Sequence, residues 1–306
     1  MCGIVGLFLK DPALESRLGR LTAAMLHEMR ERGPDSAGFA VYGPARNGET
    51  LVVLDRSGEA AWPEIAAQMG AAIGTAVGCR PVGDHGVFQI DGAAGPARDW
   101  LALHHPGLVV LSYGKRMQIF KGRGDPDAVA ARFGLAEMTG SHALAHTRMA
   151  TESAVVTEGS HPFATAPDQC LVHNGSLSNH NRLRRGLIVN GIRFETANDS
   201  EVAAAFVSAR LSEGASLAEA LEAGLKELDG FYTFAVATAD GLAILRDPIA
   251  CKPAVLAETD QWVAMASEFR AIAALPGVES ARIWEPEPGV VHAWSHSPHD
   301  GRRQAA

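Results

Sequence analysis

Cysteine is scarce in this sequence, and the spacing of the few that occur excludes two common roles. The four cysteines lie far apart, at Cys2, Cys79, Cys170 and Cys251. They form no C-x-x-C pair, so neither a disulfide framework nor a zinc site is predicted. The twelve histidines include no H-E-x-x-H motif, and we therefore expect no metal on this chain.

Long apolar runs and an excess of basic charge are also absent. No apolar run reaches the ~18 residues of a membrane helix. The first apolar run is short, lacks a basic start and ends at Lys10-Asp11, unlike a secretory signal peptide. The formal net charge of −8 disfavours nucleic acid and anionic membrane as partners. A cytoplasmic location is therefore expected.

The sequence does contain enough apolar residues for a sizeable core. Hydrophobic residues make up 47% and charged residues 20% of the 306 residues, as in folded globular proteins. Many short strands, grouped helices and no linker or repeat predict a layered α+β domain over 2–294, with a flexible tail at 295–306. The runs 37–42 and 50–54 are predicted to pair as strands, and 13–31 to form one amphipathic helix.

The N-terminal residues Met1-Cys2-Gly3-Ile4-Val5-Gly6 carry the strongest chemical signal. If Met1 is removed, which the small side chain of Cys2 permits, one residue holds both a thiol and a free α-amino group. The thiolate is a nucleophile, and a neutral amine of pKa ~8 can take its proton. A buried cysteine in a first strand is the alternative. These residues alone leave both interpretations open.

Further motifs follow along the chain in a fixed order. They are Arg32-Gly33-Pro34-Asp35-Ser36-Ala37-Gly38, His146-Thr147-Arg148-Met149-Ala150-Thr151, His161-Pro162-Phe163, His173-Asn174-Gly175 and Asp199-Ser200-Glu201. With the N-terminal Cys-Gly-Ile-Val-Gly, this ordered set resembles the class II glutamine amidotransferases, the N-terminal-nucleophile glutaminases. A smaller pattern from Arg246-Asp247-Pro248 to Lys252-Pro253 extends the resemblance to residue 253.

The resemblance implies the fold of that family, an α+β, four-layer αββα sandwich in which two antiparallel sheets face each other between outer helices. Residues 44–140 are longer than the matching stretch of the plainest family members, so an inserted segment or an elaborated edge is expected there. Because the α-amine of Cys2 serves as the base, His146 and His173 are expected to be core or supporting residues.

Asn174 and Gly175 form the predicted oxyanion hole, since an Asn side-chain amide and a following backbone N–H can aim at one oxygen. An Asn-Gly pair is also a common hairpin turn, which is the alternative for these two residues. Arg148 is predicted to bind the α-carboxylate of glutamine bidentately, and Asp199 its α-ammonium. Asp199 or Ser200 is also expected to cap the helix predicted from Asp199 to Ser212.

Four more residues complete the predicted pocket. Thr151 is expected to add a hydroxyl beside Arg148. The resemblance places Arg32 and Gly33 next to the nucleophile and gives His161 a part in forming the glutamine pocket. The predicted reaction is hydrolysis of glutamine to glutamate and ammonia through a thioester on Cys2.

No second catalytic domain that would consume ammonia is recognisable: the sequence has no S-G-G-x-D-S loop and no Walker A motif. The stretch 141–181 is similar to the stand-alone amidotransferase subunits of glutamate-synthase-like complexes, such as N-methylglutamate synthase. That resemblance implies synthase partners that bring FMN and, as a further option, an iron–sulfur cluster, with no cofactor on this chain. Two alternatives stay open: an amidohydrolase for another amide, and a non-catalytic regulatory subunit.

Overall fold

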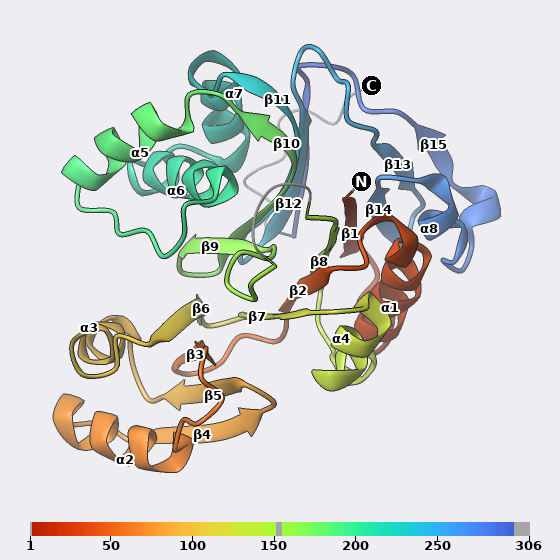
Figure 1. Ribbon diagram of the computed structural model, residues 1–306. Helices are drawn as coiled ribbons and strands as arrows, with labels where there is room; N and C mark the ends of the chain where they lie inside the picture. The colour runs from red at the N-terminus through yellow and green to blue at the C-terminus, as the bar shows by residue number, and fades with distance from the viewer. Residues whose placement is uncertain (1, 151–154, 297–306) are drawn as a thin grey trace.

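Two antiparallel sheets form the centre of the molecule (Figure 1). The structure is a computed structural model, and it describes residues 2–150 and 155–296. The larger sheet has the strand order β15 (Arg282–Trp284), β13 (Val255–Glu258), β14 (Trp262–Ala266), β1 (Gly3–Leu9), β8 (His142–Arg148), β2 (Ser36–Tyr42) and β7 (Met117–Arg123). The second has the order β16 (Val291–Ser295), β12 (Gly241–Arg246), β11 (Gly230–Ala237), β10 (Gln169–Leu177) and β9 (Phe163–Ala166).

The main core lies between these two sheets. Buried side chains of β1 and β8, such as Ile4 and Leu144, share one apolar cluster with Val172 of β10 and Ile244 of β12. Packing the apolar side chains of the two sheets against each other removes their surface from water.

Helices cover the outer faces of both sheets. The larger sheet is covered by α1 (Leu18–Glu28), α4 (Pro126–Arg132) and α8 (Phe269–Ala273). On the second sheet lie α6 (Asp199–Ser212) and α7 (Leu217–Glu227), with α5 (His180–Val189) packed on α6. Short 3-10 helices span Pro12–Arg17, Arg30–Arg32, Leu135–Glu137 and Val278–Ser280. The predicted αββα arrangement is therefore confirmed.

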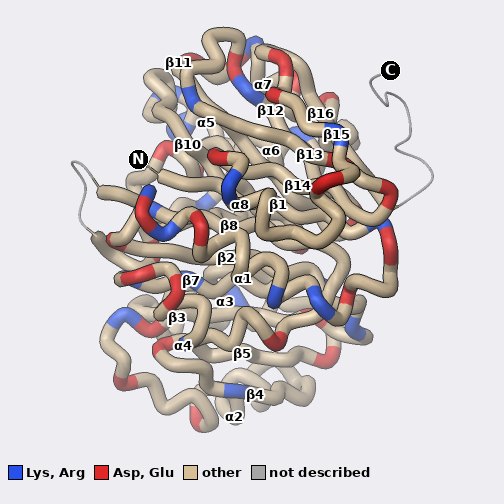
Figure 2. Tube along the Cα trace, turned by 90° about the vertical axis from the view of Figure 1, so that its right-hand side faces the viewer, with Lys and Arg blue, Asp and Glu red and all other residues tan. Residues whose placement is uncertain are grey.

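A third antiparallel sheet is built from the first part of the segment 44–140. Its strand order is β4 (Val77–Val82), β5 (His85–Ile90), β3 (Glu49–Asp55) and β6 (Leu108–Gly114). With α2 (Trp62–Ile73) and α3 (Gly95–His104), it encloses an apolar cluster of its own. It lies at the end of the molecule away from the five-stranded sheet (Figures 1 and 2). The last part of the segment returns to the main body as β7 and α4.

One aspartate ties the third sheet to the other two. Asp168 lies in the turn between β9 and β10, and its carboxylate accepts the backbone N–H groups of Lys115, Arg116 and Met117 at 2.8–2.9 Å. These residues connect β6 to β7. A Cβ on Gly114 would come within 2.3 Å of the Asp168 carboxylate, so the close approach requires glycine there.

Several expectations about individual elements were wrong. Strand β2 does not pair with β3: it pairs with β7 and β8, while β3 pairs with β5 and β6 in the third sheet. Both strands are apolar, and the hydrophobic pattern does not identify a strand's partner. The helix expected over 13–31 is shorter, because a 3-10 helix that starts at Pro12 precedes α1. The sequence also did not predict β4, α3, β9 or β15. Most of the tail expected at 295–306 lies outside the described residues.

Candidate active site

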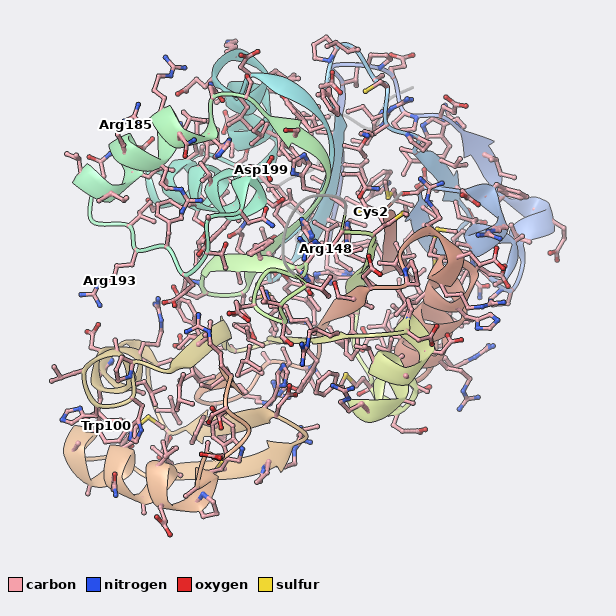
Figure 3. All side chains as sticks on the ribbon, in the orientation of Figure 1. Cys2, Trp100, Arg148, Arg185, Arg193 and Asp199 are labelled. Carbon is pink, nitrogen blue, oxygen red and sulfur yellow. The ribbon has the colours of Figure 1, made fainter. Side chains whose placement is uncertain are left out.

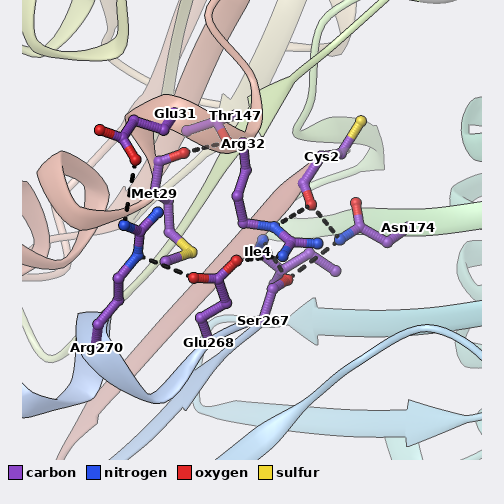
Figure 4. Close-up of polar contacts among 10 residues, drawn as sticks. All are labelled: Cys2, Ile4, Met29, Glu31, Arg32, Thr147, Asn174, Ser267, Glu268 and Arg270. Carbon is purple, nitrogen blue, oxygen red and sulfur yellow. Dashed lines mark hydrogen bonds and ion pairs between the residues drawn. The ribbon is translucent and has the colours of Figure 1, made fainter.

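Cys2 directly precedes β1 at the centre of the larger sheet, where it is partly exposed. Its backbone carbonyl accepts hydrogen bonds from Nε of Arg32 at 3.0 Å and from Nδ2 of Asn174 at 3.2 Å (Figure 4). Its thiol lies 3.8 Å from the carbonyl oxygen of Met149. The first residue of a processed chain is therefore held through its backbone, while its sulfur lies at the surface of the site.

Asn174 lies on β10 and bridges the two main sheets. Its Nδ2 donates to the Cys2 carbonyl and, at 3.2 Å, to Oγ of Ser267, while its Oδ1 accepts a hydrogen bond from Nε2 of His146 at 3.0 Å. Ser267 in turn accepts the backbone N–H of Ile4 at 2.9 Å. These contacts fix which end of the amide faces Cys2. The structure therefore brings the predicted oxyanion residue next to Cys2.

Gly175 continues β10 rather than forming a turn. The strand runs on to Leu177, and Gly175 stands opposite Tyr232 of β11. The hairpin-turn alternative for Asn174-Gly175 is therefore wrong. The backbone at Gly175 has φ 149°, and an added Cβ would meet the carbonyl oxygen of Phe231 at 2.0 Å. Only glycine fits this position.

Arg148 ends β8 and is buried, with 8% of its surface exposed. The segment that starts at Gly33 packs directly on its backbone, since a Cβ on Gly33 would lie 2.5 Å from the backbone nitrogen of Arg148. Asp35 donates its N–H to the Arg148 carbonyl at 3.1 Å, and its carboxylate accepts the N–H of Ala150 at 2.8 Å. The Arg32–Asp35 motif thus sets the path of the chain around Arg148. Thr151 lies outside the described residues.

Asp199 opens α6, but it does not cap the helix. The N-cap is Asn198, whose side chain accepts the N–H of Ser200 at 2.8 Å. The expectation that Asp199 or Ser200 is the cap was therefore wrong by one or two residues, since all three are good cap formers. Instead, the Asp199 carboxylate accepts the backbone N–H of Leu177 at 2.9 Å and lies 3.8 Å from Nδ1 of His173. Figure 3 shows Cys2, Arg148 and Asp199 in the middle of the molecule.

Three buried histidines lie beneath the site. The rings of His146 and His161 are 4.1 Å apart, and His173 bonds Oγ of Ser200 at 2.9 Å. Burial lowers the pKa of His146 and of His173 to about 4, and that of His161 well below its usual value. All three are therefore neutral and weakly basic near neutral pH. This fits supporting roles better than proton transfer.

Arg32 is held within a chain of alternating charges. Besides the Cys2 carbonyl, it pairs with the carboxylate of Glu268, which also pairs with Arg270 at 2.9 Å. Arg270 continues to Glu31 at 3.4 Å (Figure 4). The Arg32 side chain is 9% exposed. Its contacts position the backbone of Cys2.

Ser267 and Glu268 were missed as functional residues in the sequence. They lie immediately before α8, where Ser and Glu are ordinary helix-start residues. Their position more than 260 residues from Cys2 gives no local signal. Within 2–150 and 155–296, no group of three His, Cys, Asp or Glu side chains could hold a metal ion, and no helix is long and apolar enough to cross a membrane.

Comparison with known proteins identifies the family of the chain. A family described as a glutamine amidotransferase domain matches residues 146–274. The chain is 52% identical to the glutamine amidotransferase-like protein GlxB of Rhizobium meliloti, over 97% of this chain and 99% of that protein. The chain belongs to the glutamine amidotransferase family. The predicted resemblance to the glutamine amidotransferases is thereby confirmed.

More distant matches agree in fold. The glutamine phosphoribosylpyrophosphate amidotransferase of Bacillus subtilis superposes with a TM-score of 0.61 at 20% identity, over 96% of this chain and 47% of that one. An amidophosphoribosyltransferase of Methanocaldococcus jannaschii is 28% identical over 62% of this chain and 41% of its own length. At 20% identity, the structural match supports the fold alone.

Proposed function

We propose that this amidotransferase hydrolyses glutamine to glutamate and ammonia through a thioester on Cys2. The contact between the Cys2 carbonyl and the Asn174 amide carries the proposal, because it places an oriented N–H donor beside the residue that bears the proposed nucleophile. Removal of Met1 makes the Cys2 amine available as a base. Arg148 and Asp199 bind the α-carboxylate and the α-ammonium of glutamine.

In the proposed reaction, the α-amine of Cys2 takes the thiol proton and the thiolate attacks the side-chain amide carbon. The Asn174 N–H that donates to the Cys2 carbonyl is shared with the oxyanion, and together with the Gly175 N–H it stabilises the negative charge. The C–N bond breaks, and the leaving nitrogen takes a proton from the α-ammonium to depart as ammonia. Water then attacks the thioester, giving glutamate and restoring the thiol. The Arg32–Glu268 pair keeps the backbone of Cys2 in place throughout.

The Cys2→Ala variant tests this scheme. We expect folded protein with no detectable glutaminase activity, measured as glutamate formed. Cys251→Ala is the matched control, because Cys251 is exposed and takes no part in the proposed chemistry; it should keep full activity. Intact-mass measurement should show Met1 removed in active protein. Turnover in Cys2→Ala would overturn the proposal.

We further propose that the ammonia passes to a separate synthase subunit in the cytoplasm, in a glutamate-synthase-like complex such as N-methylglutamate synthase. Free ammonia would be diluted in solution, so transfer within a complex is physically favoured. The partner would carry FMN and, as a further option, an iron–sulfur cluster. Co-purification of the native protein, followed by absorption spectra of any partner, tests this. A homogeneous chain with full synthase activity and no partner would contradict it.

A further inference from the structure

Lys121 on β7 has a buried ammonium group that the proposed reaction does not use. The residue is 3% exposed. Its Nζ donates to the backbone carbonyls of Glu158 at 3.1 Å, Ser160 at 2.8 Å and Pro162 at 3.2 Å. All three ammonium protons therefore have acceptors on one short segment. That segment, residues 158–162, has no helix or strand of its own to fix its path.

The same segment carries His161 and is pressed against β2. A Cβ on Gly38 would meet the carbonyl oxygen of His161 at 2.2 Å and Cβ of Lys121 at 2.5 Å. The ring of His161 lies 4.1 Å from His146, which bonds Oδ1 of Asn174. An unbroken series of contacts thus leads from Lys121 through His161 to the oxyanion residue.

Two carboxylates and one imidazole face the Lys121 ammonium. Glu158 and Glu201 raise its pKa, but burial dominates and lowers it to about 7. Glu201 also accepts the N–H groups of Glu195 and Thr196 at 2.8 Å. His161, the third facing group, is kept neutral by burial and by the nearby positive charge. A neutral amine has two N–H groups, so its deprotonation removes one of the three donors.

We propose that Lys121 is a positioning residue for glutamine: it holds the segment 158–162 beside Arg148, where a Cβ on Gly159 would lie 3.7 Å from Nη1 of the guanidinium. The inference rests on the proposed function, since that function assigns the glutamine α-carboxylate to Arg148. It predicts that loss of the ammonium weakens substrate binding more than it slows the chemistry at Cys2.

Steady-state kinetics of Lys121→Met test the proposal. The variant should raise KM for glutamine about tenfold or more, the usual effect of losing a charge-assisted hydrogen bond, with a smaller change in kcat. Lys226→Met is the matched control, because Lys226 is exposed on α7, and it should behave like the wild type. An unchanged KM in folded Lys121→Met would overturn the proposal.

Labelling of Cys2 separates the pocket from the nucleophile. A chloromethyl ketone analogue of glutamine should alkylate Lys121→Met more slowly than the wild type, whereas iodoacetamide, which needs no pocket, should react at the same rate. Equal slowing of both reagents would mean that Lys121 acts on the thiol, and the inference would fail. Cys2→Ala decides the proposed function separately, since it removes all turnover whatever the role of Lys121.

If Lys121→Met does not fold, the pH dependence of KM decides. The wild-type KM should rise as the pH increases through about 7, because one donor is lost. Lys121→Arg stays charged over this range, so its KM should not show this rise. Titration of glutamine itself affects both proteins equally and cancels in the comparison. Identical pH profiles of KM for the two proteins would overturn the inference.

Discussion

His146 offers a direct test of how the oxyanion amide is oriented. Its Nε2–H donates to Oδ1 of Asn174, which leaves Nδ2 to face Cys2 and Ser267. Replacing His146 with Phe keeps an aromatic ring of similar size but removes the donor. The Asn174 oxygen is then buried without a partner, and rotation of the amide becomes easier. The orientation of the Asn174 amide seen in the wild type still makes two hydrogen bonds through Nδ2, to Cys2 and to Ser267, so this orientation remains favoured.

The expected loss of activity in His146→Phe follows from the one hydrogen bond that the Asn174 amide loses. One hydrogen bond to the amide is worth about 1–2 kcal/mol, which corresponds to a fall of about 5- to 30-fold in kcat. Asn174→Ala removes the oxyanion donor itself and should cost about 10²–10³ in kcat. Because neither residue contacts the charged groups of glutamine in this scheme, KM should change little in either variant.

The assay is steady-state glutaminase activity across a range of pH. His142→Phe is the matched control, since His142 is buried on the same strand but bonds the carbonyl of Thr238, away from the site. If His146→Phe loses as much activity as Asn174→Ala and also loses the acid limb of its pH profile, His146 is a proton acceptor and the orientation argument is refuted. An unchanged kcat would refute it as well.

Three further predictions concern packing and pH. Gly33→Ala should destabilise the fold by about 1–3 kcal/mol and raise KM, because the added Cβ would displace the backbone of Arg148. Gly95→Ala, which has open space around it, should do neither. Urea titration measures the stability of both variants, and steady-state kinetics measures their KM. Ser267→Ala should lower kcat with little effect on KM, since it leaves the Asn174 amide with one fewer contact; an unchanged kcat would contradict this. Burial lowers the pKa of His142 from 6.5 to about 3, so the unfolded chain binds more protons than the folded chain at acid pH. The free energy of unfolding should therefore decrease as the pH falls below 6.5, by about 2 kcal/mol near pH 5. Urea unfolding of the wild type and of His142→Gln at several pH values tests this contribution.

The resemblance carried by the order of the motifs predicted the two-sheet sandwich and the closeness of Cys2 to Asn174. Cys2, Arg148 and Asn174 are each identified by a short local pattern, and the apolar runs in or next to which they lie form the interior strands β1, β8 and β10. The pairing of β2 was not predictable in this way. Its choice between β3 and β7 depends on the fold of the intervening segment, and a pattern of apolar residues is the same in either case.

Ser267 and Lys121, which support the site, could not be predicted from the sequence for a similar reason. Ser267 reaches Ile4 and Asn174 only after three sheet strands are in register, and Lys121 looks like an ordinary lysine on an edge strand. Nothing near either residue in the chain marks it as buried or bonded. By contrast, the cap at Asn198 was missed by one position because Asn, Asp and Ser follow one another, and propensity alone does not choose among them.

The carboxylate of Asp168 has a practical consequence for anyone who wishes to trim or graft this protein. It accepts three consecutive backbone N–H groups where the third sheet joins the two main sheets. These bonds hold the third sheet in a fixed position relative to the rest of the protein. A deletion of the third sheet that keeps Gly114 and the following turn would preserve these hydrogen bonds. A deletion that ends inside the turn would leave the Asp168 carboxylate without its hydrogen-bond donors.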